Sequence, residues 1–510
     1  MNEVTVAKFA ALMKYSPSMR NRLSVLLLSI AIPAIAQTTT VSVDWSHPIA
    51  TSHATPTLQV VVNPQLLRGA KLHDSTFASL HSLGADYVRY VPWLPYPKQA
   101  VAELRAPTTT ETSWDFTHID PTLDDFMQAT AGHSVVMNFS TIPAWMYKTD
   151  KPVTYPDDPN QVFWHYTQGH ELRDPSMKEV ADYFARLVSW YTQGGFTDEL
   201  GKRHESGHHY KFAYWEVLNE IEFEHNWSPG TYTRFYDTVT AAIHQIDPTI
   251  RFVGLALGAP STHPEMFEYF LNPANHRPGA PLDFISYHFY AEPTSAQTID
   301  DWQYTFFDQA EGFLHTIRFA EQIRKRLSPS TRTDLNELGI ILPEDGKEIA
   351  NPTYVAPAPP AAYWNLAGSM YAYLYVEMAR MGIDVVGESQ LVGYPSQYPS
   401  VSMMSYATTK PNARYWTLKL LHDHLGEGDT MLETHGGSKD LVAQAFTHQG
   451  HKLLLFANKR NHPVPLTLPV GAIHVSYVSP TTGENPIAEQ DLTTPTLTLE
   501  PFEVAIVSLD

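Results

Sequence analysis

Two glutamates stand at the ends of strand-like segments and could act as a pair. Glu220 ends the run Trp215-Glu216-Val217-Leu218-Asn219-Glu220, and Glu337 follows Asp334-Leu335-Asn336. A buried carboxylate without a partner is costly, so a glutamate that ends an apolar strand usually has a specific task. Two carboxyl groups suit cleavage of a glycosidic bond, because one protonates the leaving oxygen while the other attacks the anomeric carbon. Rigid strands can hold such groups about 5 Å apart, which is the spacing of a retaining mechanism.

Other strand ends offer side chains that could complete such a site. His288 and Tyr290 would tune the protonation of the two carboxyls and orient the attacking one. Trp145 could stack on a sugar face, and Arg89 could form an ion pair with a site carboxylate. Purely structural roles stay open for His288, as a satisfied strand-end histidine, and for Trp145, as core packing. Two further residues could either line the pocket or be structural: Asn138 and Glu388.

The elements that must position these residues alternate between short apolar strands and amphipathic helices, which is typical of parallel β/α units. Asp174-Pro175 predicts one helix start and Ser228-Pro229 another. Eight such units over roughly 360 residues predict an α/β fold, a (β/α)₈ TIM barrel whose chemistry lies at the carboxyl ends of its strands. The expected strands are Leu58–Val62, Asp86–Val91, Ser134–Phe139, Phe212–Leu218, Arg251–Leu255, Asp283–Tyr287, Thr333–Asn336 and Asp384–Gly387.

The pattern changes after Leu425, where β-favouring segments are separated by Gly, Pro and Asn and no helical period remains. This region predicts a smaller C-terminal β-sandwich, which the segment Thr38–Val43 could complete. The expected organisation is a signal peptide at 1–36, an N-terminal segment at 37–57, a catalytic barrel at 58–424 and a β-sandwich at 425–510. The expected sandwich strands are Leu441–Phe446, Lys452–Ala457, Pro465–Leu468, Ile473–Val478, Thr496–Leu499 and Val504–Leu509.

The N-terminus resembles an export signal. Lys14, Arg20 and Arg22 precede the apolar run 23–32, and Ala34-Ile35-Ala36 offers small residues for a signal peptidase. The apolar run is too short for a permanent membrane anchor. We therefore expect a secreted or periplasmic protein with no membrane contact after cleavage, with a buried N-terminal helix as the alternative.

Charge and cysteine content exclude several classes. The formal net charge of −20 argues against a nucleic-acid partner, because polyanions would be repelled. The absence of cysteine removes disulfides, thiol nucleophiles and cysteine-bound zinc. No Walker loop, dinucleotide fingerprint or nucleophile elbow stands where it would be needed. We expect neither a metal nor an organic cofactor, and the sequence leaves the oligomeric state open.

One competing motif remains. His204-Glu205-Ser206-Gly207-His208 matches the HExxH pattern of zinc peptidases, with His204 and His208 as ligands and Glu205 as base. That motif works only on a helix, where both histidines share a face. Gly207 and the lack of an apolar period argue against a helix here, and the segment precedes a strand, on the side of the barrel opposite the chemistry.

The chain resembles clan A glycoside hydrolases and, among them, family 39. The resemblance rests on Asn219-Glu220 after a strand that carries Trp215, on His288-Phe289-Tyr290 and on Glu337 at strand seven, and it covers most of residues 58–510. It implies that Glu220 is the general acid/base and Glu337 the nucleophile. It also implies that Asn219 contacts the 2-hydroxyl of the sugar and that Tyr290 hydrogen-bonds the nucleophile.

The chain departs from the family pattern at three places. Leu218 stands where the family commonly has Trp, Ile221 where it has Pro, and strand eight ends in Gly387-Glu388-Ser389-Gln390 without a tryptophan. Long loops at 148–173, 342–362 and 389–410 could wall off a pocket. The resulting hypothesis is a secreted retaining glycosidase, exo-acting on plant-type oligosaccharides and similar to a β-xylosidase. A non-catalytic carbohydrate-binding barrel and the zinc peptidase are the alternatives.

Overall fold

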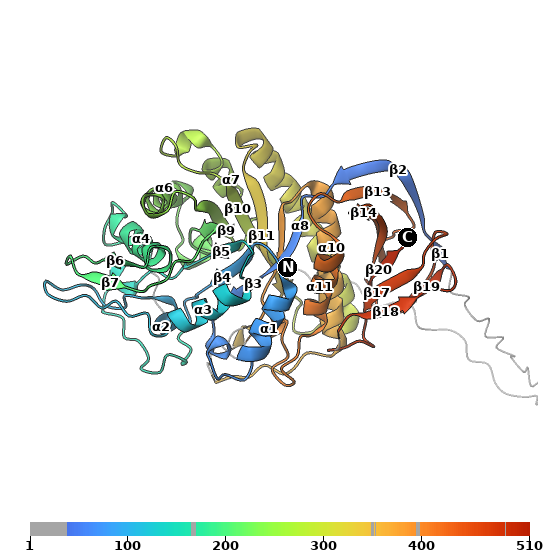
Figure 1. Ribbon diagram of the computed structural model, residues 1–510, viewed down its shortest axis with the longest axis horizontal. Helices are drawn as coiled ribbons and strands as arrows, with labels where there is room; N and C mark the ends of the chain where they lie inside the picture. The colour runs from blue at the N-terminus through green and yellow to red at the C-terminus, as the bar shows by residue number, and fades with distance from the viewer. Residues whose placement is uncertain are drawn as a thin grey trace, which may run out of the picture. The chain divides into compact units, whose positions relative to one another are not determined.

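Eight parallel strands close into a barrel in the computed structural model, which describes residues 38–164, 170–347, 351, 353–393, 398–484 and 486–509 (Figure 1). The ring follows chain order and closes where the last strand pairs with the first. Each strand overlaps one predicted segment, so the predicted (β/α)₈ barrel is confirmed. The strands are β3 (Thr55–Val61), β4 (Val88–Val91), β5 (Val135–Met137), β8 (Tyr214–Glu216), β9 (Arg251–Leu257), β10 (Phe284–Ala291), β11 (Arg332–Ile340) and β12 (Val385–Glu388).

Helices connect the strands and bury their apolar faces against the barrel. The main helices are α1 (His73–Leu83), α3 (Asp120–Ala129), α4 (Lys178–Thr192), α6 (Pro229–Ile246), α7 (Pro264–Phe270), α8 (Ile299–Leu327), α10 (Ala362–Met381) and α11 (Ala413–His424). Within the described residues, the helices of a single turn are α2 (Pro97–Ala100) and α5 (Ile221–Glu224). The part of the chain that the structure describes also has 3₁₀ turns at Pro64–Leu66, Ala144–Met146, Pro273–Asn275 and Pro399–Val401.

One of the two predicted helix starts is correct. Ser228 caps α6, since its side chain accepts a hydrogen bond from the backbone of Thr231 and Pro229 takes the first turn. The other start is wrong: α4 begins at Lys178, after Asp174-Pro175. The Asp174 carboxylate instead accepts the backbone N–H groups of Ser176 and Glu179, at 2.9 and 3.0 Å, so it orders the entry to the helix.

The barrel interior is apolar at one end and polar at the other. The cluster at the amino ends of the strands consists of Val136, Tyr214, Val253, Phe284 and Val385. Along β10, inward-facing side chains alternate from Phe284 in this cluster to Ser286, His288 and Tyr290. The last three bond to glutamates, so the period-two pattern of one strand leads from the apolar base to the polar mouth.

The predicted β-sandwich is also confirmed. A seven-stranded sheet has the order β18-β17-β20-β15-β14-β13-β2, and a three-stranded sheet has the order β1-β16-β19 (Figure 1). The predicted strands correspond to β14 (Leu441–His448), β15 (His451–Asn458), β16 (Val464–Thr467), β17 (His474–Val478), β19 (Thr496–Leu499) and β20 (Val504–Ser508). Sequence reasoning missed β13 (Thr430–His435) and β18 (Ala488–Asp491).

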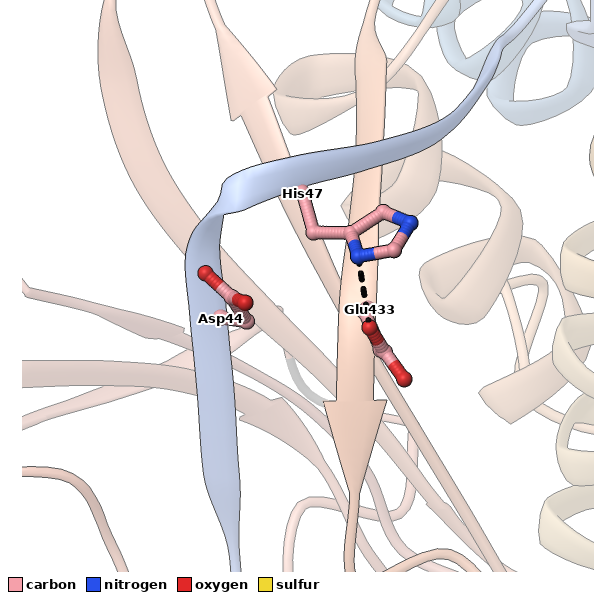
Figure 2. Close-up of side chains that lie close together, drawn as sticks. All are labelled: Asp44, His47 and Glu433. Carbon is pink, nitrogen blue, oxygen red and sulfur yellow. Dashed lines mark ion pairs between the residues drawn. The ribbon is translucent and has the colours of Figure 1, made fainter.

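The N-terminal segment contributes strands to both sheets. β1 (Thr39–Thr40) pairs with β16, and β2 (Ser42–Thr51) pairs with β13. β2 contains a bulge, because the pairing of Pro48 with Leu432 is followed by that of Asp44 with Glu433. The bulge brings Asp44, His47 and Glu433 together, with His47 Nδ1 2.9 Å from Glu433 Oε2 (Figure 2). Their exposure makes this a surface ion pair that closes the bulge.

The signal peptide predicted at 1–36 lies outside the described residues. Within the described ranges, no helix combines the length and apolar character needed to cross a membrane.

Candidate active site

Glu220 lies where β8 gives way to the single turn α5. Its backbone has a left-handed φ of 40°, and Leu218 just before it has a φ of 68°. Such conformations cost about 1–3 kcal/mol each, and they concentrate at functional sites. The turn is held to the next strand by a 2.8 Å bond from the Glu220 N–H to the carbonyl of Ala256. The strained backbone therefore aims the Glu220 carboxyl across the barrel mouth.

Glu337 lies on β11 and is almost completely buried. One carboxylate oxygen accepts the hydroxyl of Tyr290 at 2.6 Å, and the other accepts the guanidinium of Arg89. Burial by itself would raise the pKa of Glu337, but the charges of His288 and Arg89 and the Tyr290 hydrogen bond outweigh it and lower the pKa below 4.5. Glu337 is therefore held as an ionised carboxylate.

His288 lies between the two glutamates. Its Nδ1 is 3.0 Å from Glu220 Oε1 and 3.6 Å from Glu337 Oε2. The acceptor atoms of Glu220 and Glu337 and the His288 nitrogen all lie within 4.8 Å of one another. Burial disfavours the imidazolium, but the charges of Glu337 and Glu220 prevail and raise the pKa of His288. These three groups are also close enough to bind a metal ion, yet Arg89 and His288 already neutralise the two carboxylates.

Arg89 organises the floor of the site from strand β4, and it is buried. Besides Glu337 it donates to Glu216 at 2.5 Å, to the side-chain Oε1 of Gln59 at 2.6 Å and to Asn219 Oδ1 at 2.7 Å. Burial by itself would lower the pKa of this guanidinium, but the charges of Glu216 and Glu337 raise it, so Arg89 stays charged. The predicted pairing of Arg89 with a site carboxylate is observed, and it involves two carboxylates at once.

Asn138 supports this floor from below. Its amide donates to the Glu216 carboxylate and, at 2.9 Å, to the carbonyl of Leu218. Glu216 also accepts the hydroxyl of Ser286 at 2.5 Å and the amide of Asn336 at 2.8 Å. Of the two roles that were open for Asn138, the structure favours the structural one, because Asn138 holds the Glu216 carboxylate that pairs with Arg89.

A cavity of about 520 Å³ opens above the two glutamates. Ser389, at the end of β12, lies behind it and contacts Tyr290 at 2.7 Å and Gln59 at 2.6 Å. The described lining residues are Gln59, Val61, Val91, Trp93, Asn219, Glu220, Phe223, Gly258, Ala259, Tyr290, Glu292, Glu337, Ile341, Gln390, Tyr398 and Val401. Four of the predicted site residues thus surround one pocket: Asn219, Glu220, Tyr290 and Glu337.

Two predicted residues lie elsewhere. The Trp145 indole donates to the carbonyl of Glu103 at 2.8 Å and is covered by the guanidinium of Arg173, 4.4 Å from the ring centre. Glu388 is buried against Arg414 at 2.7 Å, and burial raises its pKa to about 7. Both residues lie outside the described lining of the cavity. We therefore do not count them among the residues that face a substrate.

Sequence reasoning missed the aromatic wall of the cavity. Trp93 and Tyr398 line it, with ring centres 6.2 Å apart, and Trp164 contacts Trp93 at 5.5 Å and Tyr398 at 5.9 Å. Trp93 follows β4 by two residues, a position that could have been read as a strand end. Tyr398 lies in the loop after β12, and no pattern in the sequence indicates that this loop turns toward the cavity. Glu216 and Gln59 were also missed, although both lie on barrel strands.

The HExxH segment does not form a metal site. His204 and Glu205 lie in strand β7 (Arg203–Glu205), which pairs with β6 (Gly195–Thr197) in a hairpin. His204 contacts Asp198 at 2.8 Å, whereas His208 lies 3.5 Å from Asp120. The two histidines therefore have different carboxylate partners and do not share a helical face, which removes the zinc peptidase alternative.

A closed (β/α)₈ barrel with glutamates at the ends of strands four and seven defines the clan A glycoside hydrolases as the class of protein. The sequence profile of the glycosyl hydrolases family 39 matches residues 28–329, which is more than half of the chain. The chain belongs to this family. It is a glycosidase, and its substrate is a carbohydrate. A search of curated protein sequences gave no match.

Solved structures with the same fold have low sequence identity to the chain. The GH51 arabinofuranosidase from Xanthomonas axonopodis pv. citri has a TM-score of 0.62 at 12% identity, with 93% of this chain and 100% of that chain covered. The GH51 alpha-L-arabinofuranosidase from Thermotoga petrophila RKU-1 has a TM-score of 0.58 at 13% identity, with 93% and 100% covered. A GH30 endoxylanase from Clostridium papyrosolvens C71 has a TM-score of 0.54 at 12% identity, also with 93% and 100% covered. These similarities show the fold.

Proposed function

We propose that the protein is a retaining exo-glycosidase that works by double displacement, with Glu220 as general acid/base and Glu337 as nucleophile. The observation that carries this proposal is the spacing of the two carboxyls, whose facing oxygens lie within 4.8 Å. Retaining glycosidases have carboxyls about 5–5.5 Å apart, whereas inverting ones need about 6.5–9.5 Å to admit a water molecule.

The two steps use the geometry directly. Glu337 Oε attacks the anomeric carbon and forms a glycosyl ester, while Glu220 gives its proton to the departing glycosidic oxygen. Glu220 then removes a proton from water, whose oxygen attacks the same carbon and releases Glu337. Arg89 and Tyr290 hold Glu337 as a carboxylate and fix its direction, and His288 holds the Glu220 carboxyl.

The cavity favours a small glycone. A volume of about 520 Å³ is within the range of small-molecule pockets and suits one or two sugar rings. Trp93 and Tyr398 offer ring faces on which a sugar can stack, in place of Trp145. From the family resemblance we propose a β-xyloside on a plant-type oligosaccharide as the first substrate to test. The arabinofuranosidases among the similar structures make an α-L-arabinofuranoside the second.

A panel of aryl glycosides tests this function on the wild type and on Glu220→Ala. We expect hydrolysis of at least one aryl pentoside and a loss on the order of 10²–10⁴-fold in the variant, because proton donation is lost. Azide should restore turnover of Glu220→Ala and give a glycosyl azide of retained configuration, since it attacks the intermediate in place of activated water. Activity on long polymers alone would refute the exo assignment, and an unaffected variant would refute the role of Glu220.

The pH profile should reflect the lowered pKa of Glu337. Since the nucleophile stays ionised below its ordinary value of 4.5, we expect the acid limb of kcat/KM to fall below pH 4.5. Tyr290→Phe removes a hydrogen bond that lowers this pKa, so the limb should move to higher pH. The exposed Tyr304→Phe is the matched control and should leave the limb in place. If the acid limb of kcat/KM stays at the same pH in Tyr290→Phe, this limb does not report the ionisation of Glu337.

Gly258 lies so close to Glu220 that no side chain fits. A Cβ at this position would be 2.6 Å from Glu220 Oε1 and 2.7 Å from the ring of Phe223. We expect Gly258→Ala to lower kcat by about 10- to 100-fold, because displacement of a catalytic group by about 1 Å has this effect. Gly312→Ala, in α8 with open space around it, should keep full activity. Equal activities of the two variants would show that the Glu220 carboxyl tolerates displacement.

We further propose that the protein is exported and that cleavage follows Ala36, as the N-terminal pattern suggests. The test is the intact mass and N-terminal sequence of the protein recovered from the periplasm and the medium. Retention of the full-length chain in the cytoplasm would contradict export.

A further inference from the structure

We propose that Glu224 is a positioning residue, which orients Asn219 and Trp93 toward the bound sugar through a single shared oxygen. This proposal rests on the proposed function, because it assigns those two residues to recognition of the glycone. Glu224 itself lies outside the described lining of the cavity, whereas Asn219 and Trp93 both line it.

The position of Glu224 follows from the single turn that begins at Glu220. The backbone N–H of Glu224 donates to the carbonyl of Glu220 at 2.8 Å, so the turn brings residue 224 back beneath the acid/base. Its Oε1 accepts the Asn219 side-chain amide and the Trp93 indole N–H, each at 2.9 Å. One acceptor thereby joins the loop after β4 to the end of β8.

The two donors are constrained from their other sides as well. Asn219 Oδ1 accepts from Arg89 at 2.7 Å, so Arg89 and Glu224 together fix both ends of the amide. The Trp93 ring packs edge-on against Trp164 and near Tyr398. Without the Glu224 oxygen, the amide could rotate and the indole could tilt, while the two catalytic carboxyls would keep their own partners.

The protonation of Glu224 makes the inference testable. Burial raises its pKa to about 8, although the bonds from Asn219 and Trp93 act in the opposite direction. The charges of Glu220 and Glu337 raise it further. The pKa of Tyr147 is raised by burial and, in addition, by the charge of Glu224. Below pH 8 the group is a neutral acid, which glutamine reproduces in shape, charge and acceptor oxygen.

The experiment compares Glu224→Gln with Glu224→Leu on the best aryl glycoside at pH 6. We expect Glu224→Gln to stay within about threefold of the wild type in kcat and KM, since the acceptor is kept. Glu224→Leu should raise KM by about tenfold or more with a smaller change in kcat, because the lost bonds serve binding. Glu103→Leu is the matched control: this buried carboxyl has a pKa raised to about 8 but lies outside the cavity lining. It should lower the melting temperature and leave KM unchanged.

The outcomes separate the hypotheses. If Glu224→Gln is as inactive as Glu220→Ala, Glu224 acts as a charged catalytic group and the proposal is wrong. If Glu224→Leu keeps the wild-type KM, Glu224 has a merely structural role and the proposal is wrong. If Glu224→Leu does not fold, Trp93→Phe, which removes one of the two donors, must raise KM for the proposal to stand. A wild type inactive on every glycoside would contradict the proposed function instead, and calorimetric titration with the free sugar would still test Glu224.

A second readout uses pH. A carboxyl whose pKa is higher in the folded state stabilises the fold at low pH and loses this contribution as pH rises from 4.5 through about 8. Glu224→Gln cannot ionise, so its melting temperature should equal that of the wild type at pH 5 and exceed it at pH 9. If the difference in melting temperature between Glu224→Gln and the wild type is the same at pH 5 and at pH 9, Glu224 ionises freely in the folded protein.

Discussion

Glu337→Ala removes the proposed nucleophile, and turnover should fall by on the order of 10⁴–10⁶-fold, as in other enzymes that lose a nucleophile. Arg89 and Tyr290 would remain aimed at an empty position, since each keeps other partners: Arg89 with Glu216, and Tyr290 with Ser389. Azide added to this variant can occupy that position and attack the anomeric carbon directly. The product should then be a glycosyl azide of inverted configuration, which proton NMR of the reaction mixture identifies.

Glu388→Gln is the control for this experiment. Glu388 is another buried glutamate at a strand end, but its partner is Arg414 and it lies outside the cavity lining. The control should keep its turnover and produce no glycosyl azide. A Glu337→Ala enzyme that retains wild-type activity, or whose azide product keeps the substrate configuration, would overturn the assignment of the nucleophile.

Arg89→Met should have the second largest effect, and on both stability and activity. Methionine fills part of the volume but leaves the buried carboxylates of Glu216 and Glu337 without their cation. Breaking a buried pair by removing one partner costs about 3–5 kcal/mol, so the free energy of unfolding should fall by this amount in a denaturant titration. The pKa of Glu337 should rise at the same time, since Arg89 is one of the groups that lower it. The acid limb of kcat/KM should therefore move to higher pH.

Arg68→Met separates this effect from the loss of any ion pair. Arg68 contacts Asp125 with two bonds of 2.9 Å, but its side chain is 57% exposed. Exposed pairs contribute about 0–1 kcal/mol, so this variant should unfold nearly as the wild type does. If both arginine variants lost the same free energy of unfolding, the expected cost of breaking the buried ion pairs of Arg89 would be wrong.

The barrel and the meeting of Glu220 and Glu337 at its mouth could be predicted because both depend on local pattern. Strand and helix periods identify eight units, and the carboxyl ends of the strands in such a barrel surround its active-site face. His288 and Tyr290 could be predicted for the same reason, since inward positions alternate along β10 and both meet glutamates. These residues need only the strand and its period to be placed.

Glu388 and the aromatic wall could not be predicted in this way. Val385 on β12 faces the apolar cluster of the barrel, so Glu388, three residues later, faces the helices and meets Arg414. All four residues of β12 are buried, and a strand buried on both sides gives no sequence signal for its direction. Trp93 and Trp145 both follow barrel strands, and only the course of their loops decides which of them reaches the cavity.

The pairing of β2 with β13 also has a consequence for folding during synthesis, because the two strands lie far apart in the sequence. Thr51 is made early in synthesis, and its partner Thr430 is made late. Because a chain is synthesised at about 5–20 residues per second, β2 stays without its partner strand for on the order of tens of seconds. Throughout synthesis it is an unpaired β edge open to aggregation or to a chaperone. A chain that keeps β2 but ends before β13 would leave β2 without this partner permanently, so the chain is best produced and engineered whole.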